Sequence, residues 1–550
     1  MTDQNDTRSA PALSDSQSGV TERSAPKAVY WCRNCSVPLI SPTCDICGST
    51  GKYCGVDLKP VFPEERSLLE RFLRRSGVLS AEGRLPKELY INRGRVVWRG
   101  KRLFEFRVTA GEIVLKCEFS LSPDDYGCGS DDFVHRAVEA NESALAELEK
   151  EALQFVNNAL TEFLEAEPIV AFSGGKDSAV TAYLVSQVTR PVLFFSNTTI
   201  EYPETYEYIS SFAESFGLEL VREEPNTDFL TMCEQLGPPS RILRWCCSVF
   251  KGTLLSRFLN RLDHEAINFD GIRRRESNRR SKYERVTKNP KVVKQVTFRP
   301  IIDWTSLEVW LYNFWRDLPL NPLYFRGFGR VGCYSCPNNT EYDDFLTNEH
   351  YPELWTQWQE RLARFFDREY ANEYGNVHRE QWLREGLWKK RMPHRNTEYS
   401  TVSRPCLEHS GLSYEMSKLV DEQLVQFLKP LGEVRLLELG NEVGLSLIQT
   451  DWYQISGVLN DNRLTATFLN GRGYQSKLLI ERQLKKWLNC VGCGACAGTC
   501  PVGAISIQAG SFQIADNLCT KCQECVRSNF TRQGCVALSY KSNSLRIRKE

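Results

Sequence analysis

The segment from Ile169 to Ser178, Ile-Val-Ala-Phe-Ser-Gly-Gly-Lys-Asp-Ser, combines residue types that bind a phosphate anion. Its first four residues are apolar and predict a buried parallel strand, and residues 179–187 predict a helix. Two glycines permit a tight turn that points N–H groups at an anion, on the positive end of that helix. We therefore expect a nucleotide site, rather than a glycine-rich turn without ligand, at Ser173, Gly174, Gly175, Lys176, Asp177 and Ser178.

Eight cysteines near the C-terminus have the spacing of a bacterial ferredoxin: Cys490-x2-Cys493-x2-Cys496-x3-Cys500-Pro501, then Cys519-x2-Cys522-x2-Cys525 and Cys535. In that pattern the fourth cysteine of each run ligates the other [4Fe–4S] cluster. The resemblance implies one set of Cys490, Cys493, Cys496 and Cys535, and a second of Cys519, Cys522, Cys525 and Cys500. Nine residues rather than three precede Cys535, and no proline follows it, which we interpret as an inserted loop. Zinc at all eight cysteines is the alternative.

Four cysteines near the N-terminus, Cys32-x2-Cys35-x8-Cys44-x2-Cys47, have the two-knuckle layout of a zinc ribbon. Gly48 suits the tight turn after the second knuckle. We expect a structural Zn²⁺ here, with iron or a redox role as the alternative.

A third group of cysteines consists of the adjacent pair Cys246-Cys247 and the distant Cys333-x2-Cys336. Two adjacent cysteines bind one tetrahedral zinc with poor geometry, but each can ligate a different iron of a cubane. The distant pair can supply the other two ligands. We expect a third [4Fe–4S] cluster at these four residues, against the alternative of two structural cysteines and an unrelated Cys-x2-Cys.

The ordered motifs over residues 166–340 resemble the phosphoadenosine phosphosulfate (PAPS) reductase family of the PP-loop ATP pyrophosphatase superfamily. They are the loop at 173–178, Asn197-Thr-Thr-Ile-Glu-Tyr-Pro-Glu-Thr-Tyr206, the two cysteine pairs, Gly271-Ile-Arg-Arg-Arg-Glu-Ser277, Trp304-Thr305 and Asn321-Pro-Leu-Tyr324. The resemblance implies an adenine nucleotide α-hydrolase-like fold. It also implies that the second phosphate- and sulfate-binding arginines are Arg273 and Arg274; a solvated basic loop is the alternative.

Two departures from the reductases shape the predicted activity. The sequence holds no Glu-Cys-Gly-X-His segment to supply the attacking thiol, and the loop keeps its lysine, Lys176, which reductases often replace by an acidic residue. Both favour the branch that cleaves ATP to AMP and pyrophosphate and then inserts sulfur into an acceptor. The ATP-pyrophosphatase subunits of DNA phosphorothioation systems and tRNA-thiolating PP-loop enzymes look similar.

The predicted catalytic residues are thus Lys176, Asp177, Arg273 and Arg274. Lys176 and the loop N–H groups would hold the pyrophosphate, and Asp177 would help to bind Mg²⁺ with ATP. A cysteine desulfurase or another donor would provide sulfur, and the ferredoxin segment would accept electrons from a further partner. The alternatives are an adenylylsulfate or PAPS reductase that makes sulfite, and a non-catalytic electron-transfer or assembly subunit.

These sites need several modules to position them, and 550 residues predict at least three domains. We expect an α/β doubly wound parallel sheet at 166–340, because strands at 192–195 and 266–270 alternate with helices. Around it we place a disordered tail (1–29), the zinc ribbon (30–57), an α+β accessory module (58–165), a helical and mixed α/β region (341–475) and the ferredoxin-type domain (476–545). In the accessory module we expect strands at 88–91, 95–98 and 112–119 and a helix at 139–164.

Composition limits the compartment and the partners. Hydrophobic residues make up 41% and charged residues 25%, and no run is long enough to span a membrane. Fourteen of the 21 cysteines lie in Cys-x2-Cys or Cys-Cys groups, which is typical of metal ligation in a reducing cytoplasm.

A net charge of zero leaves nucleic-acid binding to local patches. Six basic residues lie between Arg273 and Lys282, and Trp388-Lys-Lys-Arg391 with His394 and Arg395 adds a patch that carries an aromatic. We therefore predict a nucleic-acid acceptor, with DNA ahead of tRNA, bound with a strong dependence on salt.

Overall fold

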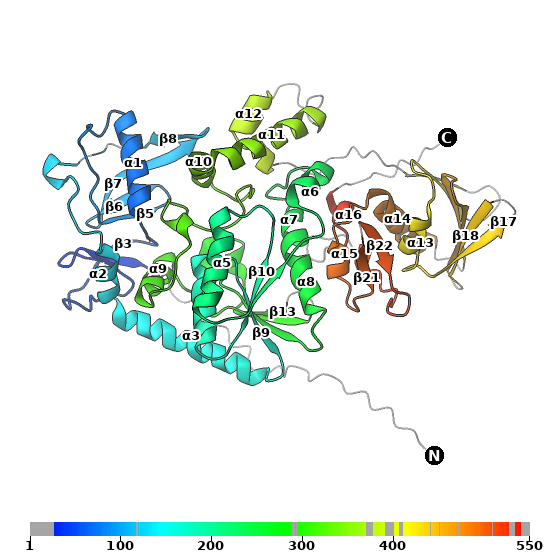
Figure 1. The fold of residues 1–550 in the computed structure, drawn as a ribbon, viewed down its shortest axis with the longest axis horizontal. Helices are drawn as coiled ribbons and strands as arrows, with labels where there is room; N and C mark the ends of the chain where they lie inside the picture. The colour runs from blue at the N-terminus through cyan, green and yellow to red at the C-terminus, as the bar shows by residue number, and fades with distance from the viewer. Residues whose placement is uncertain are drawn as a thin grey trace, which may run out of the picture.

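A computed structural model describes residues 27–116, 119, 121–288, 292, 294–369, 378–390, 401–405, 411–439, 442–449, 452–469, 473–508, 510–526 and 534–540. Figure 1 shows the parallel-sheet domain at the centre, the N-terminal modules on one side and the ferredoxin-type segment on the other. Within these ranges, no helix has the length and apolar character needed to cross a bilayer. Nearly all of the predicted N-terminal tail lies outside the described residues.

The central sheet has six strands in the order β11-β10-β9-β12-β14-β13. The first five are parallel, and only the edge strand β13 (Val286–Lys288) is antiparallel. The parallel strands are β11 (Leu220–Glu223), β10 (Val192–Ser196), β9 (Glu167–Ala171), β12 (Ala266–Phe269) and β14 (Gln295–Phe298). This order confirms the predicted doubly wound α/β fold. Its topological switch point lies between β9 and β12, which is where such sheets bind ligands.

Alternating side chains of β9 and β10 bury the two faces of the sheet under different helices. Val170 and Leu193 pack with α3 (Glu142–Glu162), α4 (Lys176–Ser186) and α5 (Pro203–Ser215). Ile169 and Phe194 pack on the opposite face with α8 (Thr253–Leu259). Because helices cover both faces of the sheet, the side chains on either face are apolar. This explains the continuous hydrophobic run in the sequence.

The N-terminal modules are two antiparallel sheets. The ribbon sheet has the order β2-β1-β3, with strands β1 (Val29–Cys32), β2 (Val37–Leu39) and β3 (Lys52–Gly55). The accessory sheet runs β4-β5-β6-β7-β8 in sequence order. Its strands are β4 (Lys59–Pro60), β5 (Leu89–Asn92), β6 (Arg95–Trp98), β7 (Lys101–Thr109) and β8 (Glu112–Leu115), with α1 (Pro63–Arg75) and α2 (Phe133–Glu139) beside them. The strand predicted over 112–119 therefore ends at Leu115.

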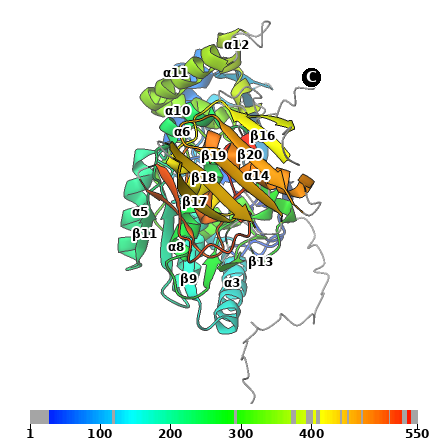
Figure 2. The ribbon, with the colours of Figure 1, turned by 90° about the vertical axis from the view of Figure 1, so that its right-hand side faces the viewer.

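Residues 306–390 are largely helical: α9 (Ser306–Trp315), α10 (Glu341–His350), α11 (Pro352–Glu369) and α12 (Arg379–Arg384). The region beyond 400 contains a six-stranded antiparallel sheet in the order β15-β16-β20-β19-β18-β17. Its strands are β15 (Thr401–Pro405), β16 (Gly411–Met416), β17 (Glu433–Leu439), β18 (Glu442–Gln449), β19 (Tyr453–Val458) and β20 (Arg463–Phe468). Figure 2 shows these strands side by side at one end of the molecule.

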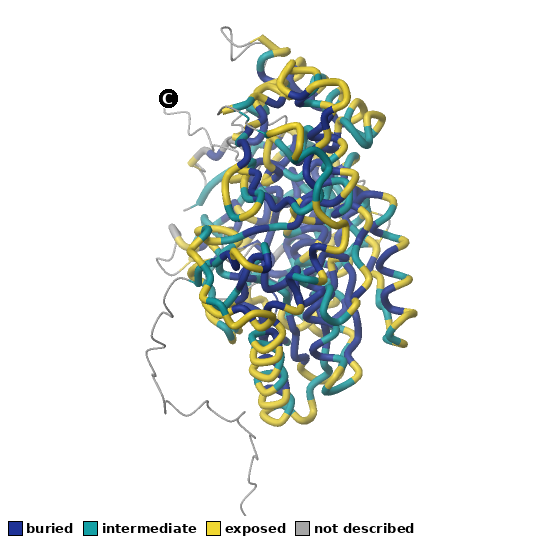
Figure 3. Tube along the Cα trace, turned by 90° about the vertical axis from the view of Figure 1, so that its left-hand side faces the viewer, coloured by how far each residue is buried: buried dark blue, intermediate teal, exposed yellow. Residues whose placement is uncertain are grey.

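The C-terminal segment joins that antiparallel sheet to the central domain. Helices α13 (Glu422–Leu428) and α14 (Gly473–Asn489) pack in one core with the strands of the sheet and with the cysteine-rich segment. The latter contains α15 (Ala495–Gly498), β21 (Ile505–Gln508), β22 (Ser511–Ile514) and α16 (Val536–Tyr540). Figure 3 shows buried residues in the interior and exposed ones along the outer turns of the chain.

Candidate active site

The loop at residues 173–178 lies at the carboxyl end of β9, and α4 begins at Lys176. Gly174 has a φ of +75°, and a Cβ there would lie 3.1 Å from side-chain atoms of both Thr205 and Ile209. A side chain at this position would be strained and crowded, so the turn requires glycine. The sequence predicted the helix to begin at Ala179. It begins three residues earlier, which places Lys176 and Asp177 in its first turn.

Several groups from distant segments hold this loop in place. The Lys176 N–H donates to the Tyr324 hydroxyl at 2.8 Å, and the Asn321 amide donates to the Gly174 carbonyl at 3.2 Å. The Ser173 N–H donates to Ser178 Oγ at 3.3 Å. Within the described residues, no protein acceptor binds the N–H groups of Gly174 and Gly175. These two donors, at the positive end of α4, are free to bind an anion.

Charge converges on Asp177. Its carboxylate accepts from Lys176 Nζ at 2.6 Å and forms a short ion pair with Arg273 Nε. Burial alone would raise the pKa of Asp177, but Arg273 and Lys176 outweigh burial and hold that pKa well below its usual range. Burial lowers the pKa of Lys176, while Asp177 opposes that shift. Both cations therefore lie at the loop, held by a carboxylate that a phosphate could replace.

The second predicted arginine has a different position from the first. Arg273 is buried and reaches the loop because Gly271 lets the backbone approach α4: a Cβ on Gly271 would lie 2.7 Å from the Asp177 carbonyl oxygen. Arg274 instead pairs with Asp303 and donates to the Tyr283 carbonyl at 3.0 Å. The structure thus brings Arg273, and not Arg274, to Asp177.

Asp57 is a neighbour of this site that the sequence did not indicate. Its carboxylate accepts from the N–H groups of Ser306 at 3.1 Å and Leu307 at 3.0 Å, at the start of α9. Burial raises the pKa of Asp57, and the nearby positive charge of Arg273 opposes that rise. The segment that leaves the ribbon therefore supports both α9 and the arginine at the nucleotide loop.

The four cysteines of the third group come together beside the loop. Cys246 interacts electrostatically with Cys247, Cys333 and Cys336, although the two pairs are far apart in the sequence. The Cys-Cys pair lies in α7 (Trp245–Cys247), which leads directly into a π-helical turn (Ser248–Gly252) and α8. The second pair follows Val331 closely in the sequence. A Cβ added to Gly175 would lie 3.9 Å from the Cβ of Val331. One short segment thus joins the nucleotide loop to the four thiols.

Three cations and one carboxylate lie near these thiols. A hydrogen bond with Cys246 lowers the pKa of Cys247 to about 5; burial opposes the shift, while Lys251, Arg244 and Arg330 add to it. Thr198 Oγ1 lies 3.4 Å from Cys333 Sγ, and the buried Glu201 is within 3.6 Å of the same sulfur. Four convergent thiols with cations around them are the donor chemistry that an anionic iron–sulfur cluster requires.

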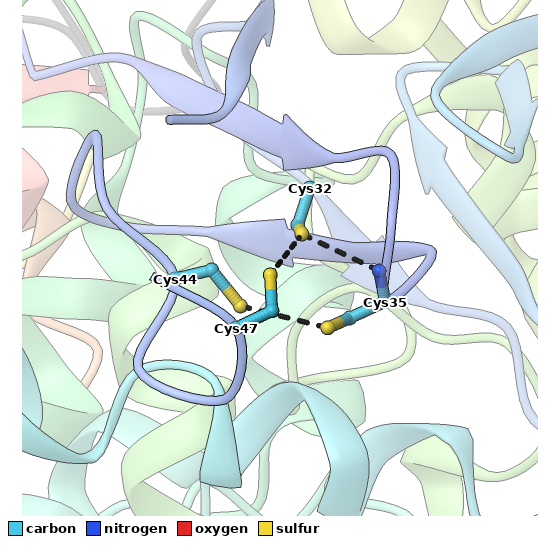
Figure 4. Close-up of side chains that lie close together, drawn as sticks. All are labelled: Cys32, Cys35, Cys44 and Cys47. Carbon is cyan, nitrogen blue, oxygen red and sulfur yellow. Dashed lines mark hydrogen bonds between the residues drawn. The ribbon is translucent and has the colours of Figure 1, made fainter. Parts of the chain in front are cut away.

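The ribbon cysteines converge more tightly. The sulfur atoms of Cys32, Cys35, Cys44 and Cys47 all lie within 4.8 Å of one another (Figure 4). Three of them are buried, and Cys47 is exposed. Four thiols at this separation fit one tetrahedral ion, so the structure places a metal-binding group where the sequence predicted one.

The ferredoxin-type cysteines divide into two groups. Cys535 interacts with Cys490 and Cys496, and Cys493 interacts with the same three residues. Cys519 instead interacts with Cys500, Cys522 and Cys525. Burial alone would lower the pKa of Lys486 on α14, but four of these thiols outweigh burial and raise that pKa: Cys496, Cys525, Cys535 and Cys490. Cys496 also interacts with Cys525 of the second group, and the assignment of these cysteines to two clusters stays a prediction.

A model of the phosphoadenosine phosphosulfate reductase domain matches residues 167–339, and a model of a 4Fe-4S binding domain matches residues 487–506. An adenosine 5′-phosphosulfate reductase of Bacillus mycoides is 31% identical over 195 residues, which are 34% of this chain and 80% of that protein. The chain belongs to the PAPS reductase family. It also contains a segment that matches a 4Fe-4S binding domain.

Other relatives of the PAPS reductase family extend the match only partly. Two uncharacterized proteins of Methanocaldococcus jannaschii are each 32% identical, over 255 and 228 residues, or 46% and 41% of this chain. The chain spans about half the length of these two relatives, 51% and 55%.

Two solved structures align with part of this chain. The PAPS reductase of Candida auris aligns with 16% identity and a TM-score of 0.29, covering 38% of this chain and 98% of that one. The U34-tRNA thiolase NcsA of Methanococcus maripaludis aligns with 17% identity and a TM-score of 0.27, covering 43% and 82%. At these scores neither similarity supports a conclusion about this chain.

The structure corrects the basic patches predicted as a nucleic-acid surface. Trp388 is buried, so it cannot stack on a base, and Lys389 is buried in an ion pair with Asp344. Arg391, His394 and Arg395 lie outside the described residues. In the first patch Arg273, Arg274 and Arg280 are paired with carboxylates, which leaves Arg279 and Lys282 as exposed cations without ion pairs in the described structure. The positions of basic residues in the sequence do not show which of them form ion pairs with carboxylates in the folded chain.

Proposed function

We propose that this PAPS reductase family member cleaves ATP between the α- and β-phosphates to activate an acceptor for sulfur insertion. The observation that carries the proposal is the meeting of Lys176, Arg273 and two free N–H donors at the switch point, next to four convergent thiols. The retained Lys176 favours ATP, whose pyrophosphate it would bind, over a nucleotide that already carries sulfate.

The charges of the loop suggest how the reaction proceeds. An incoming triphosphate would compete with Asp177 for Lys176 and Arg273, and the released carboxylate would be free to bind Mg²⁺. The acceptor oxygen forms a bond to the α-phosphorus as the bond to the bridging oxygen breaks. Pyrophosphate then leaves with the negative charge that Lys176 and the N–H groups of Gly174 and Gly175 stabilise. A sulfur nucleophile then displaces AMP from the activated acceptor.

Three sets of cysteines would hold iron and one would hold zinc. In this proposal [4Fe–4S] clusters bind at Cys246, Cys247, Cys333 and Cys336; at Cys490, Cys493, Cys496 and Cys535; and at Cys500, Cys519, Cys522 and Cys525. Zn²⁺ binds at Cys32, Cys35, Cys44 and Cys47. When bound, such clusters supply one-electron transfer or an iron site that accepts sulfur. Lys251 and Lys486 would balance the negative charge of the thiolates.

The partners follow from this chemistry. A cysteine desulfurase or another persulfide source would deliver sulfur, and a separate protein would deliver electrons to the ferredoxin-type segment. Free thiolate ligands favour the reducing cytoplasm. We propose a nucleic-acid acceptor, DNA ahead of tRNA. Arg279, Lys282 and Lys390 are the cations of the predicted basic surface that are exposed and form no ion pair within the described residues.

A second candidate is a sulfonucleotide reductase. The specific observation in its favour is the 31% identity that covers 80% of the Bacillus mycoides adenosine 5′-phosphosulfate reductase. Against it, the sequence holds no Glu-Cys-Gly-X-His segment to attack the sulfate group.

Substitution of the loop tests the proposal. Lys176→Ala and Asp177→Ala should each lower the rate of ATP cleavage at least a hundredfold, since they remove charge that acts in the transition state. Lys150→Ala, an exposed lysine of α3, is the matched control and should cleave ATP at the wild-type rate. Wild-type rates in both loop variants would refute the assigned site.

A further inference from the structure

The hairpin formed by β6 and β7 is a basic surface segment outside the nucleotide site. Six arginines and lysines lie between residues 93 and 107, against a single acid, Glu105. Arg99 and Gly100 form its tip with φ values of 48° and 71°, as expected for a tight two-residue hairpin turn. The tip projects two flanking side chains, Trp98 and Lys101, which are directly paired across the strands.

The zinc ribbon meets this hairpin tip through close contacts. Cys54 donates to the Gly100 carbonyl at 3.8 Å, and a Cβ on Gly100 would lie 2.6 Å from the Trp31 ring. Arg95 lies close enough to Cys54 for its charge to act on that thiol. The edge strand β3 of the ribbon therefore runs beside the hairpin, and we name Lys52, Tyr53, Arg95, Arg99 and Lys101 the ribbon–hairpin strip.

The strip exposes both charge and an aromatic ring. The side chain of Tyr53 is 61% exposed. Within the described residues, Lys52, Arg95 and Lys101 form no ion pair, and all three are exposed. The Arg99 guanidinium lies 4.4 Å from the centre of the Trp98 ring, and its one carboxylate partner, Asp125, is 3.9 Å away. The strip thus combines exposed cations that form few ion pairs with one exposed aromatic ring.

The strip also has a direct route to the nucleotide loop. Val56, which follows β3, is 54% exposed, and its carbonyl accepts from Arg275 at 3.1 Å. Arg275 lies two residues after Arg273, the arginine that pairs with Asp177. The next residue of the ribbon segment, Asp57, supports α9 at the same site. The segment that follows β3 therefore connects the strip to residues that support the nucleotide loop.

We propose that the ribbon–hairpin strip binds a single-stranded segment of nucleic acid and directs it to the nucleotide loop. Cations without protein partners match the phosphates, and an exposed tyrosine offers a face on which an unpaired base stacks. A duplex keeps its bases stacked inside, so it would use the cations but not the ring. This inference rests on the proposed nucleic-acid acceptor and identifies its form and its binding surface.

The test is fluorescence anisotropy of the anaerobic, metal-loaded full chain with a labelled 16-nucleotide single strand, the same sequence as a duplex, and a tRNA. Tyr53→Ala should weaken binding of the single strand about tenfold, and Tyr53→Phe should restore it, because stacking on one base is worth about that factor. Lys52→Ser with Lys101→Ser should reduce the slope of log K against log salt by about 1.4, or about 0.7 for each phosphate contact.

A matched pair elsewhere controls for loss of charge. Arg364→Ser with Arg384→Ser removes two exposed cations of the helical region, outside every predicted basic patch, and should leave the affinity and the slope unchanged. Strip variants that bind like the wild type, or that lose no more affinity than this control, would overturn the proposal. A duplex bound more tightly than the single strand would do so too.

ATP cleavage is measured in parallel on the same variants without nucleic acid. Retained cleavage with lost single-strand binding supports the strip. Single-strand binding that depends on Tyr53 in a protein that never cleaves ATP would refute the proposed activity and leave the strip in place.

Discussion

Asp177 shows how one carboxylate can hold a site ready before its ligand arrives. It keeps Lys176 and Arg273 at the loop, and its pKa stays low because those two cations outweigh its burial. A carboxyl with a depressed pKa contributes stability above its unfolded value and loses it as pH falls through its folded value. The Asp177 carboxylate should therefore stay ionised through the neutral range.

The two neighbouring arginines give a sharp residue-level prediction. Arg273→Gln should lower the rate of ATP cleavage about a hundredfold, as removal of one transition-state donor typically does. Arg274→Gln should change it less than about threefold, because Arg274 pairs with Asp303 away from the loop. Steady-state kinetics of both variants measures these rates, and thermal melting shows whether each variant is folded. Equal losses in the two variants would contradict the assignment.

The sequence predicted the strand, the glycine turn and the helix of the loop. It did not predict the residues from distant segments that hold the loop in place. Ser173 to Ser178 was recognisable because strand, glycine turn and helix are continuous in the sequence. The Tyr324 hydroxyl accepts from the Lys176 N–H across 148 residues, and its motif alone did not predict this contact. Asp57 was missed because it carries no motif and acts through α9 and Arg273.

At the scale of elements, the ribbon is part of the core rather than a separate appendage. Trp31 and Leu39 pack in one apolar cluster with Leu184 of α4 and Leu307 of α9. The sequence predicted the ribbon from its cysteine spacing, but its attachment depends on long-range packing. For the antiparallel sheet beyond residue 400 the sequence predicts only mixed α/β structure, because the strands carry no motif and their order in the sheet is not sequential.

Loss of zinc should therefore destabilise the ribbon and also lower the affinity for the nucleotide. Cys32→Ser with Cys35→Ser should release the metal, lower the melting temperature and weaken ATP binding about tenfold, since Asp57 loses its fixed position. Cys54→Ser, outside the four-cysteine group, is the control and should keep zinc and affinity. Zinc analysis and calorimetric titration check this. A zinc-free protein that binds ATP like the wild type would show that the ribbon and the loop are independent.

At the scale of the whole molecule, the ferredoxin-type segment is joined to the same core as the four central thiols. Ala495, Val491 and Cys493 pack in one apolar cluster with Trp245 and Phe250. The small residue Gly498 permits this contact, because a Cβ there would lie 3.0 Å from the Thr253 Cα. Figure 1 shows this segment between the parallel-sheet domain and the antiparallel sheet.

This arrangement predicts the metal content of the intact chain. Anaerobically prepared protein should contain about twelve iron atoms and one zinc, from three cubanes and one four-cysteine zinc site. Cys246→Ser with Cys247→Ser should remove roughly one third of the iron and leave the zinc, while Cys233→Ser on α6 (Phe229–Leu236) should change neither. Unchanged iron in the double variant would contradict a cluster in the parallel-sheet domain.

The identity of the nucleotide products tests the central proposal most directly. Metal-loaded wild-type protein should be incubated anaerobically with ATP labelled at the α-phosphate and, separately, with adenylylsulfate, and the products separated and quantified. Cleavage between the α- and β-phosphates predicts AMP or an adenylylated acceptor, with one pyrophosphate released for each ATP consumed, and no sulfite from adenylylsulfate. Release of ADP and orthophosphate, or sulfite from adenylylsulfate with ATP left intact, would contradict it.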